Sequence, residues 1–225
     1  MGNLIASETK ERAYEVYKRV DFINYWLYTF TATCLLCLVE PFVAIWLGQA
    51  FVLTKAILIL AVAIYYFKGI NSGIDIAKNA AGLYYPDRFI PMAEAIANMV
   101  ISIVLAKRYG IAGVLFGTLV SFLALSFWAK PYFVCRDVFE VSFARYAVRE
   151  GREIVVSVLV AAGTWYAVSL VSLENVLLSF GVKALLALAL SNGLLLLVYF
   201  KTSEFQYLRG LLESAANRIG KRKKA

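Results

Sequence analysis

Residues 110–129, GIAGVLFGTLVSFLALSFWA, run for 20 positions without a charged side chain. A helix rises about 1.5 Å per residue, so this stretch is long enough to cross the roughly 30 Å hydrocarbon core of a bilayer. The whole chain has the same character, since 61% of its residues are hydrophobic and its mean hydropathy is +0.71. A soluble domain of 225 residues does not bury that much apolar surface in one core. The sequence therefore predicts a membrane protein.

Five more apolar stretches have spanning length, and each is rich in Leu, Ala, Ile and Val. The six predicted spans are residues 22–47, 54–77, 89–106, 110–129, 153–173 and 176–200. They are expected to be helices, because a helix satisfies its backbone hydrogen bonds within one segment and no series of short alternating strands recurs. We predict an all-α, polytopic membrane helix bundle in three parts: an N-terminal segment at 1–21, a six-helix transmembrane domain at 22–200 and a basic amphipathic tail at 201–225.

Lysine and arginine are distributed unevenly between the two sides of these spans. Of the 23 basic residues, 19 fall on one side, and the other side holds only Lys55, Lys107, Arg108 and Lys183. Because basic loops tend to stay in the cytoplasm, both termini are predicted to be cytoplasmic in a multi-pass inner (plasma) membrane protein. The same asymmetry accounts for most of the net charge of +8, so no nucleic-acid partner is expected.

Two amphipathic segments are predicted to lie on the membrane surface. Residues 205–219 have apolar side chains at helical spacing and precede a basic run at 221–224, which anionic lipid would attract. Residues 134–149 place Phe139 and Tyr146 on one helical face. A plain solvated helix is the alternative for both segments.

The residue content argues against several kinds of catalysis. The chain has no histidine, so Ser-His or Cys-His nucleophile pairs, zinc-activated hydrolysis and histidine proton relays lack their central group. It also lacks a glycine-rich phosphate loop. Cys34 and Cys37 have the spacing of a redox motif but lie inside the first span, where small buried side chains are the expected role. We predict no enzyme activity, no metal and no cofactor.

Polar residues recur on one face of two predicted spans. The second span and its end carry Lys68, Asn71, Asp75 and Lys78, and the third span carries Glu94, Asn98 and Ser102. Because polar groups are costly to expose to lipid, both faces are predicted to turn inward. Asp75 is expected to neutralise Lys78 one turn away.

These polar residues have two interpretations. The asparagines and the serine are as consistent with hydrogen bonds between helices as with ligand binding. Lys68, Lys78 and Arg88, each taken alone, are best explained as ordinary basic residues at the cytoplasmic rim. For Glu94 a function is favoured, because a lone carboxylate in an apolar run is protonated, paired or available to a transported cation or proton.

Small residues and a proline indicate where helices pack or bend. Gly113 and Gly117 in the fourth span, like Gly69 and Gly73 in the second, form faces that let another helix approach closely. Pro41 is expected to bend the first span near its outer end, either as a gate or as a simple structural kink.

Short motifs in a consistent order resemble one family. The first group is Gly2-Asn3-Leu4-Ile5-Ala6, Phe22-Ile23-Asn24-Tyr25-Trp26 and Pro41-Phe42-Val43-Ala44-Ile45-Trp46-Leu47-Gly48. The second group is Pro86-Asp87-Arg88, Glu94, Asn98, Ser102, Gly110-Ile111-Ala112-Gly113-Val114 and Gly117-Thr118. Together they resemble the Wzx-type polysaccharide flippases of the MATE-like (MOP) superfamily.

The resemblance implies an exporter of a polyprenyl-diphosphate-linked oligosaccharide in lipopolysaccharide or related polysaccharide biosynthesis. Family members carry twelve or fourteen spans in two lobes around an alternately opening cavity, and this chain is similar to the C-terminal portion. The expected partners are the bilayer, the lipid-linked oligosaccharide and an N-terminal lobe or second membrane chain. Glu40 stands where the family more often has Asn, so its role stays open.

In this interpretation the candidate site consists of Lys68, Lys78 and Arg88 to attract the diphosphate, Asn71 and Asn98 to bind sugar, and Asp75 and Glu94 to respond to a coupling cation or proton. One alternative is a non-transporting membrane subunit or truncated fragment. A multispan lipid-linked glycosyl or acyl transferase is a less favoured alternative.

Overall fold

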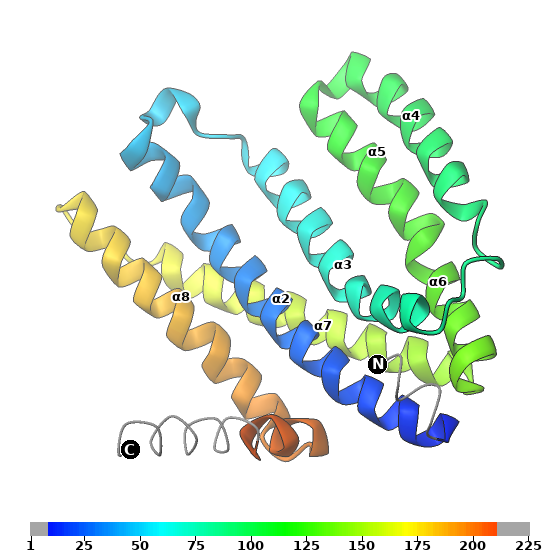
Figure 1. The fold of residues 1–225 in the computed structure, drawn as a ribbon. Helices are drawn as coiled ribbons and strands as arrows, with labels where there is room; N and C mark the ends of the chain where they lie inside the picture. The colour runs from blue at the N-terminus through cyan, green and yellow to red at the C-terminus, as the bar shows by residue number, and fades with distance from the viewer. Residues whose placement is uncertain (1–8, 211–225) are drawn as a thin grey trace, which may run out of the picture.

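The computed structural model describes residues 9–210 (Figure 1). Its elements are α2 (Lys10–Trp46), η1 (Gln49–Phe51), α3 (Lys55–Ala80), α4 (Ile90–Tyr109), α5 (Ile111–Ala124), α6 (Ser126–Val134), the π-helical turn η2 (Cys135–Phe139), α7 (Phe143–Ser169) and α8 (Val176–Tyr199). Within the described residues, six helical segments are long and apolar enough to cross a membrane, with α5, α6 and η2 together forming one of them. The prediction of an all-α membrane bundle is confirmed.

Helix α2 lies at the centre of the packing. It contacts α3 on one side and α7 and α8 on the other (Figure 1). Helices α4 and α5 form a hairpin, and this hairpin joins the rest of the bundle mainly where α5 and α6 contact α3. No residue of α4 is buried.

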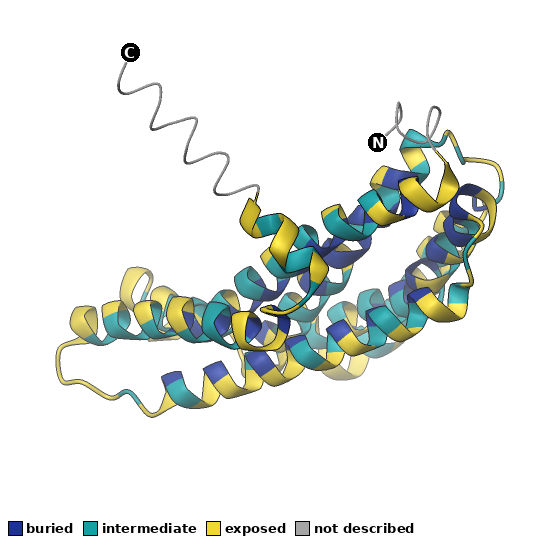
Figure 2. Cartoon of the chain, turned by 90° about the horizontal axis from the view of Figure 1, so that it is seen from below, coloured by how far each residue is buried: buried dark blue, intermediate teal, exposed yellow. Residues whose placement is uncertain are grey.

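Large apolar side chains cover much of the outer surface. Leu197 is 80% exposed and Val148 is 75% exposed, and Figure 2 shows exposed residues along the outer faces of the helices. Apolar patches of this extent mark surfaces that water does not cover. The exposed faces therefore fit a multi-pass protein whose solvent is lipid.

The turn between α4 and α5 depends on glycine. Gly110 joins the two helices with a φ of 57°, a conformation that a side chain rarely adopts. A Cβ at Gly113 would overlap the backbone carbonyl of Leu105, and a Cβ at Gly117 would lie 2.5 Å from the Ser102 hydroxyl. The predicted close-packing role of Gly113 and Gly117 is confirmed, because this hairpin has no room for larger residues.

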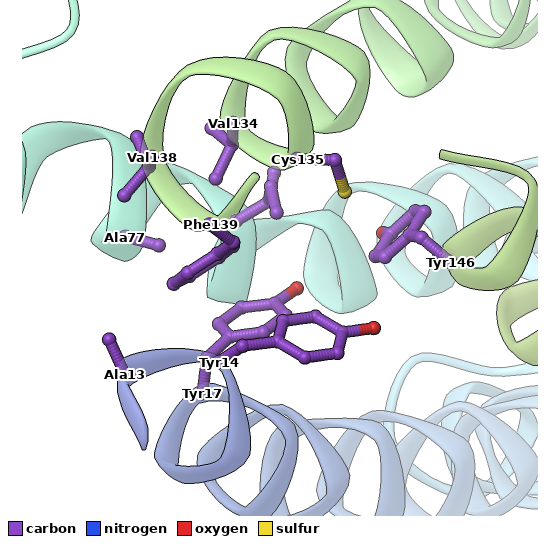
Figure 3. Close-up of a cluster of buried hydrophobic side chains, with 10 residues drawn as sticks. Ala13, Tyr14, Tyr17, Ala77, Val134, Cys135, Val138, Phe139 and Tyr146 are labelled. Carbon is purple, nitrogen blue, oxygen red and sulfur yellow. The ribbon is translucent and has the colours of Figure 1, made fainter. Parts of the chain in front are cut away.

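A cluster of aromatic side chains joins the start of α2 to η2 and the start of α7 (Figure 3). The rings of Tyr17 and Phe139 have centroids 5.1 Å apart, and Tyr14 and Phe139 are separated by 5.4 Å. Phe139 and Tyr146 are only 1% and 2% exposed. The prediction that residues 134–149 form a surface helix is therefore wrong, because their aromatic face packs against α2 instead of lipid head groups.

Several helix boundaries differ from the sequence prediction. Helix α2 begins at Lys10, inside the predicted N-terminal segment 1–21, and the Thr9 hydroxyl accepts a hydrogen bond from the Arg12 amide at 3.4 Å. Helix α7 begins at Phe143, ten residues before its predicted start. Charged residues occupy the first turns of both helices, and further along them Asp21 and Arg149 pair between α2 and α7, so hydropathy alone placed both starts too late. The predicted tail helix falls mostly on residues 211–225, outside the described residues.

Candidate functional site

Two of the predicted polar residues meet on one face of α6. Ser126 and Lys130 are one turn apart on this helix and therefore project from the same side. The Ser126 hydroxyl donates to the Glu94 carboxylate of α4, and the Lys130 ammonium pairs with Asp75 of α3 at 2.9 Å. We call these four residues the α6 polar face. It brings Asp75 and Glu94 to neighbouring turns of one short helix, although they lie on different helices.

Asn98 ties the α4–α5 hairpin together. Its side-chain oxygen accepts hydrogen bonds from Ser102 at 2.8 Å and from Thr118 at 3.2 Å. Glu94, Asn98 and Ser102 lie at intervals of one turn, so the three predicted polar residues of α4 form a single polar edge along the hairpin. The predicted stripe of the third span is thus in contact with α5 and α6.

Asn71 has a structural task that depends on a proline in another helix. Pro131 has no backbone N–H, so the carbonyl of Phe127, four residues earlier in α6, lacks its usual donor. The side-chain amide of Asn71 donates to that carbonyl at 3.1 Å. Asn71 is 2% exposed, and its own side-chain oxygen is buried without a hydrogen-bond partner.

The ion pair predicted between Asp75 and Lys78 is wrong. Lys78 pairs with Asp87 of the loop between α3 and α4, where the Asp87 side chain is 4% exposed. Asp75 pairs with Lys130 instead. Asp75 and Lys78 share a helical face that would allow a local pair, but each pairs with a residue on another element.

The other two predicted phosphate-attracting residues are exposed. The Lys68 ammonium lies 5.7 Å from the centre of the Phe122 ring. The Arg88 guanidinium lies 4.3 Å from the ring centre of Tyr85 and 4.5 Å from that of Phe89. Neither cation takes part in an ion pair among residues 9–210. Aromatic faces hold both cations without neutralising them, so both keep an attraction for anions.

A second charged cluster lies between α2 and α7, and the sequence analysis missed it. Arg149 pairs with Asp21 of α2, and its Nε lies 3.8 Å from the Glu153 carboxylate. Glu150 completes the group, and all three acids are at most 5% exposed. We call these four residues the α2–α7 acidic cluster. The sequence did contain a signal for this cluster, because Arg149, Glu150 and Glu153 are closely spaced at the start of a span. The sequence analysis used the basic residues there only to predict topology.

Hydroxyl groups continue from this cluster along the α2–α7 interface. The Tyr25 hydroxyl donates to the Glu153 carbonyl at 3.1 Å. One turn further, the Thr29 and Ser157 hydroxyls are 2.7 Å apart, and the Tyr66 hydroxyl donates to Ser157 at 2.9 Å. The polar contacts of this interface therefore follow one line along both helices.

The hydroxyls of Thr29, Tyr66 and Ser157 border a cavity of about 480 Å³ between α2, α3 and α7. Its walls are mostly apolar, and the far end carries Glu40 of α2 and Lys55 of α3. Cavities of this size in proteins commonly hold small organic molecules or a segment of a larger one. Glu40, which the sequence left without a role, is thus part of the lining of this cavity.

Together these features define the chain as a multi-pass α-helical membrane protein with charged groups held between its helices. Comparison with family models, with curated proteins and with solved structures finds no match to this chain.

Proposed function

We propose that this protein takes part in moving a lipid-linked oligosaccharide across the membrane, as part of a larger transporter. The observation that carries the proposal is the α6 polar face, where carboxylates from α3 and α4 contact a lysine and a serine of α6 between the helices of an apolar bundle. Charged residues at membrane depth are costly and mark substrate or ion pathways by default. The resemblance of residues 2–118 to polysaccharide flippases supports the same conclusion.

The chemistry of such a substrate sets three requirements. Its diphosphate needs cations, its sugars need hydrogen-bonding groups, and its polyprenyl tail stays in lipid. Lys68 and Arg88 are exposed and outside any described ion pair, so we assign the diphosphate to them first, and to Lys78 if it leaves Asp87. Asn98 and, on release from Phe127, Asn71 would bind sugar.

Glu94 and Asp75 would respond to a coupling cation or proton. Protonation of Glu94, or a cation bound to it, would change its hydrogen bond with Ser126 and weaken the join between α4 and α6. The same event at Asp75 would free Lys130 of α6. Both changes act on one short helix, so the α6 polar face would convert ion binding into movement of the α4–α5 hairpin.

The orientation belongs to this proposal as well. We propose that the protein lies in an inner membrane. The side on which α2 begins and α8 ends would face the cytoplasm, because most basic residues gather there. An N-terminal lobe or second membrane chain would complete the transport cavity.

The test is glycan export in cells that depend on this protein, with each variant expressed at equal abundance in its full assembly. Glu94→Gln and Asp75→Asn should slow export at least tenfold, which corresponds to about 1.4 kcal/mol on the transport barrier. The matched control is Glu140→Gln, at an exposed carboxylate that is not part of the α6 polar face and that pairs with Lys10 of α2. Export at the unsubstituted rate in both site variants would contradict the assignment.

A non-transporting subunit is the second candidate, and one observation favours it. Helix α4 buries none of its residues among those described, so most of its surface is available to a partner helix. A subunit that only packs would co-purify with its partner and tolerate Glu94→Gln and Asp75→Asn without loss of export. The same experiment therefore separates the two functions.

A further inference from the structure

We propose that Asp21, Glu150 and Glu153, together with the hydroxyl of Tyr17, form a binding site for a divalent cation between α2 and α7. One carboxylate oxygen from each of the three acids lies within 4.8 Å of the other two. Ca²⁺ binds oxygen ligands at 2.3–2.6 Å, so ligands on opposite sides of one ion are separated by about 5 Å. The three acids are therefore close enough to bind one ion together.

The ionised acids of the cluster outnumber its cations. Three carboxylates face one guanidinium, and Arg149 already pairs with Asp21 and Glu153. Glu150 takes part in none of the ion pairs found among the described residues, although it is 3% exposed. Ionised acids that are buried without compensation are strongly unfavourable. A divalent cation would bring the group of four charged side chains to neutrality.

An independent feature points to the same ligand. The Tyr17 side chain is 1% exposed, yet its hydroxyl has no hydrogen-bond partner. Tyr17 precedes Asp21 by one turn of α2, and among the neighbouring charges Asp21 has the largest electrostatic effect on its hydroxyl. A buried hydroxyl without a partner needs an explanation, and a cation held by the adjacent carboxylates provides one. The phenol oxygen would be the fourth protein ligand.

Neighbouring elements close the site. Gly73 of α3 packs directly on Asp21, since a Cβ at this position would lie 2.5 Å from the carboxylate oxygen. The Arg149 guanidinium lies 5.8 Å from the ring centre of Tyr17 and 5.5 Å from that of Tyr146. The site thus has acids and a phenol oxygen on one side and aromatic rings around it. The site shares no residue with the α6 polar face, so the cation proposal does not depend on the transport proposal.

The tyrosines supply a direct assay. Tb³⁺ occupies Ca²⁺ sites and emits when a nearby tyrosine is excited, and Tyr17 and Tyr146 adjoin the cluster. We expect the purified full chain in detergent to give saturable, tyrosine-sensitised Tb³⁺ emission that Ca²⁺ displaces. Glu150→Gln should abolish the saturable emission, and Tyr17→Phe, which keeps all three acids, should weaken binding several-fold. Glu140→Gln is the control, because its carboxylate is exposed and pairs with Lys10 instead of belonging to the acidic cluster.

Thermal unfolding with and without Ca²⁺ is a second measurement, and it distinguishes cation binding from a purely structural role of these residues. In a chelator, Glu150→Gln should raise the unfolding temperature, because it removes a buried negative charge. With Ca²⁺ only the unsubstituted protein should gain stability. Saturable emission that is equal in Glu150→Gln, no saturable emission at all, or an equal gain from NaCl at matched ionic strength would overturn the proposal.

Discussion

The pair formed by Lys78 and Asp87 fixes the loop between α3 and α4, and its strength can be worked out from its burial. The Lys78 side chain is 14% exposed and that of Asp87 is 4% exposed. Removing one partner from a buried pair costs about 3–5 kcal/mol, because the other charge stays buried without compensation. Lys78 keeps some access to solvent, so we expect Asp87→Asn to lower the free energy of unfolding by about 2–4 kcal/mol.

The chain contains its own control for this measurement. Lys10 and Glu140 also form an ion pair, but their side chains are 51% and 61% exposed. Exposed pairs contribute only about 0.2–1 kcal/mol, because water screens them and both side chains lose freedom. We therefore predict that the Lys78–Asp87 pair contributes more to the free energy of unfolding than the Lys10–Glu140 pair in the same protein.

A double-mutant cycle at each pair isolates the interaction energy. The variants are Lys78→Met, Asp87→Asn and their combination, and correspondingly Lys10→Met, Glu140→Gln and theirs. Unfolding is followed by circular dichroism as sodium dodecyl sulfate is titrated into a mild detergent. We expect a coupling of at least about 2 kcal/mol for the first pair and less than about 1 kcal/mol for the second. Equal couplings would refute the argument that burial decides the strength of these pairs.

Three further predictions concern packing and hydrogen bonds, and the same titration measures each. Gly69→Ala should lower the free energy of unfolding by about 1–3 kcal/mol, because its Cβ would overlap the Tyr28 ring; unchanged stability would mean that this ring moves freely. Gly181→Ala, with open space around the new Cβ in α8, should instead raise it by about 0.5–1 kcal/mol, and a loss there would point to an unseen contact. Tyr66→Phe removes the hydrogen bond to Ser157 and should cost about 1 kcal/mol, so a neutral result would argue against that bond.

The sequence predicted the helices well because the signal for a span is local. Twenty apolar residues in a row are enough to define one, and residues 176–200 became α8 (Val176–Tyr199) almost unchanged. The signal fails where charged residues belong to a buried helix end. The predicted bounds left Asp21 and Arg149 outside the spans, but they pair with each other between α2 and α7.

Partner choice was the part that sequence could not supply. Asp75 and Lys78 share a helical face, so a local ion pair was the reasonable expectation. Lys130 is 55 residues from Asp75 in the chain and reaches it only because α6 packs against α3. Asn71 gives the same lesson, since its role depends on a carbonyl that Pro131 leaves without a donor. These contacts depend on which helices pack against each other, and the periodicity of one helix does not predict its neighbours.

The hydrogen bond from Asn71 to the Phe127 carbonyl has a consequence for how the bundle can change shape. Together with the pair between Asp75 and Lys130, it fastens α6 to α3, whereas Asn98 fastens α5 to α4. The chain connects the two fastened pairs twice, at Leu125 between α5 and α6 and at residues 81–89 between α3 and α4, and at Leu125 φ of −115° and ψ of −75° depart from regular helical values. A swing of α4 and α5 against α3 and α6 therefore bends the chain at both connections, at Leu125 and within residues 81–89.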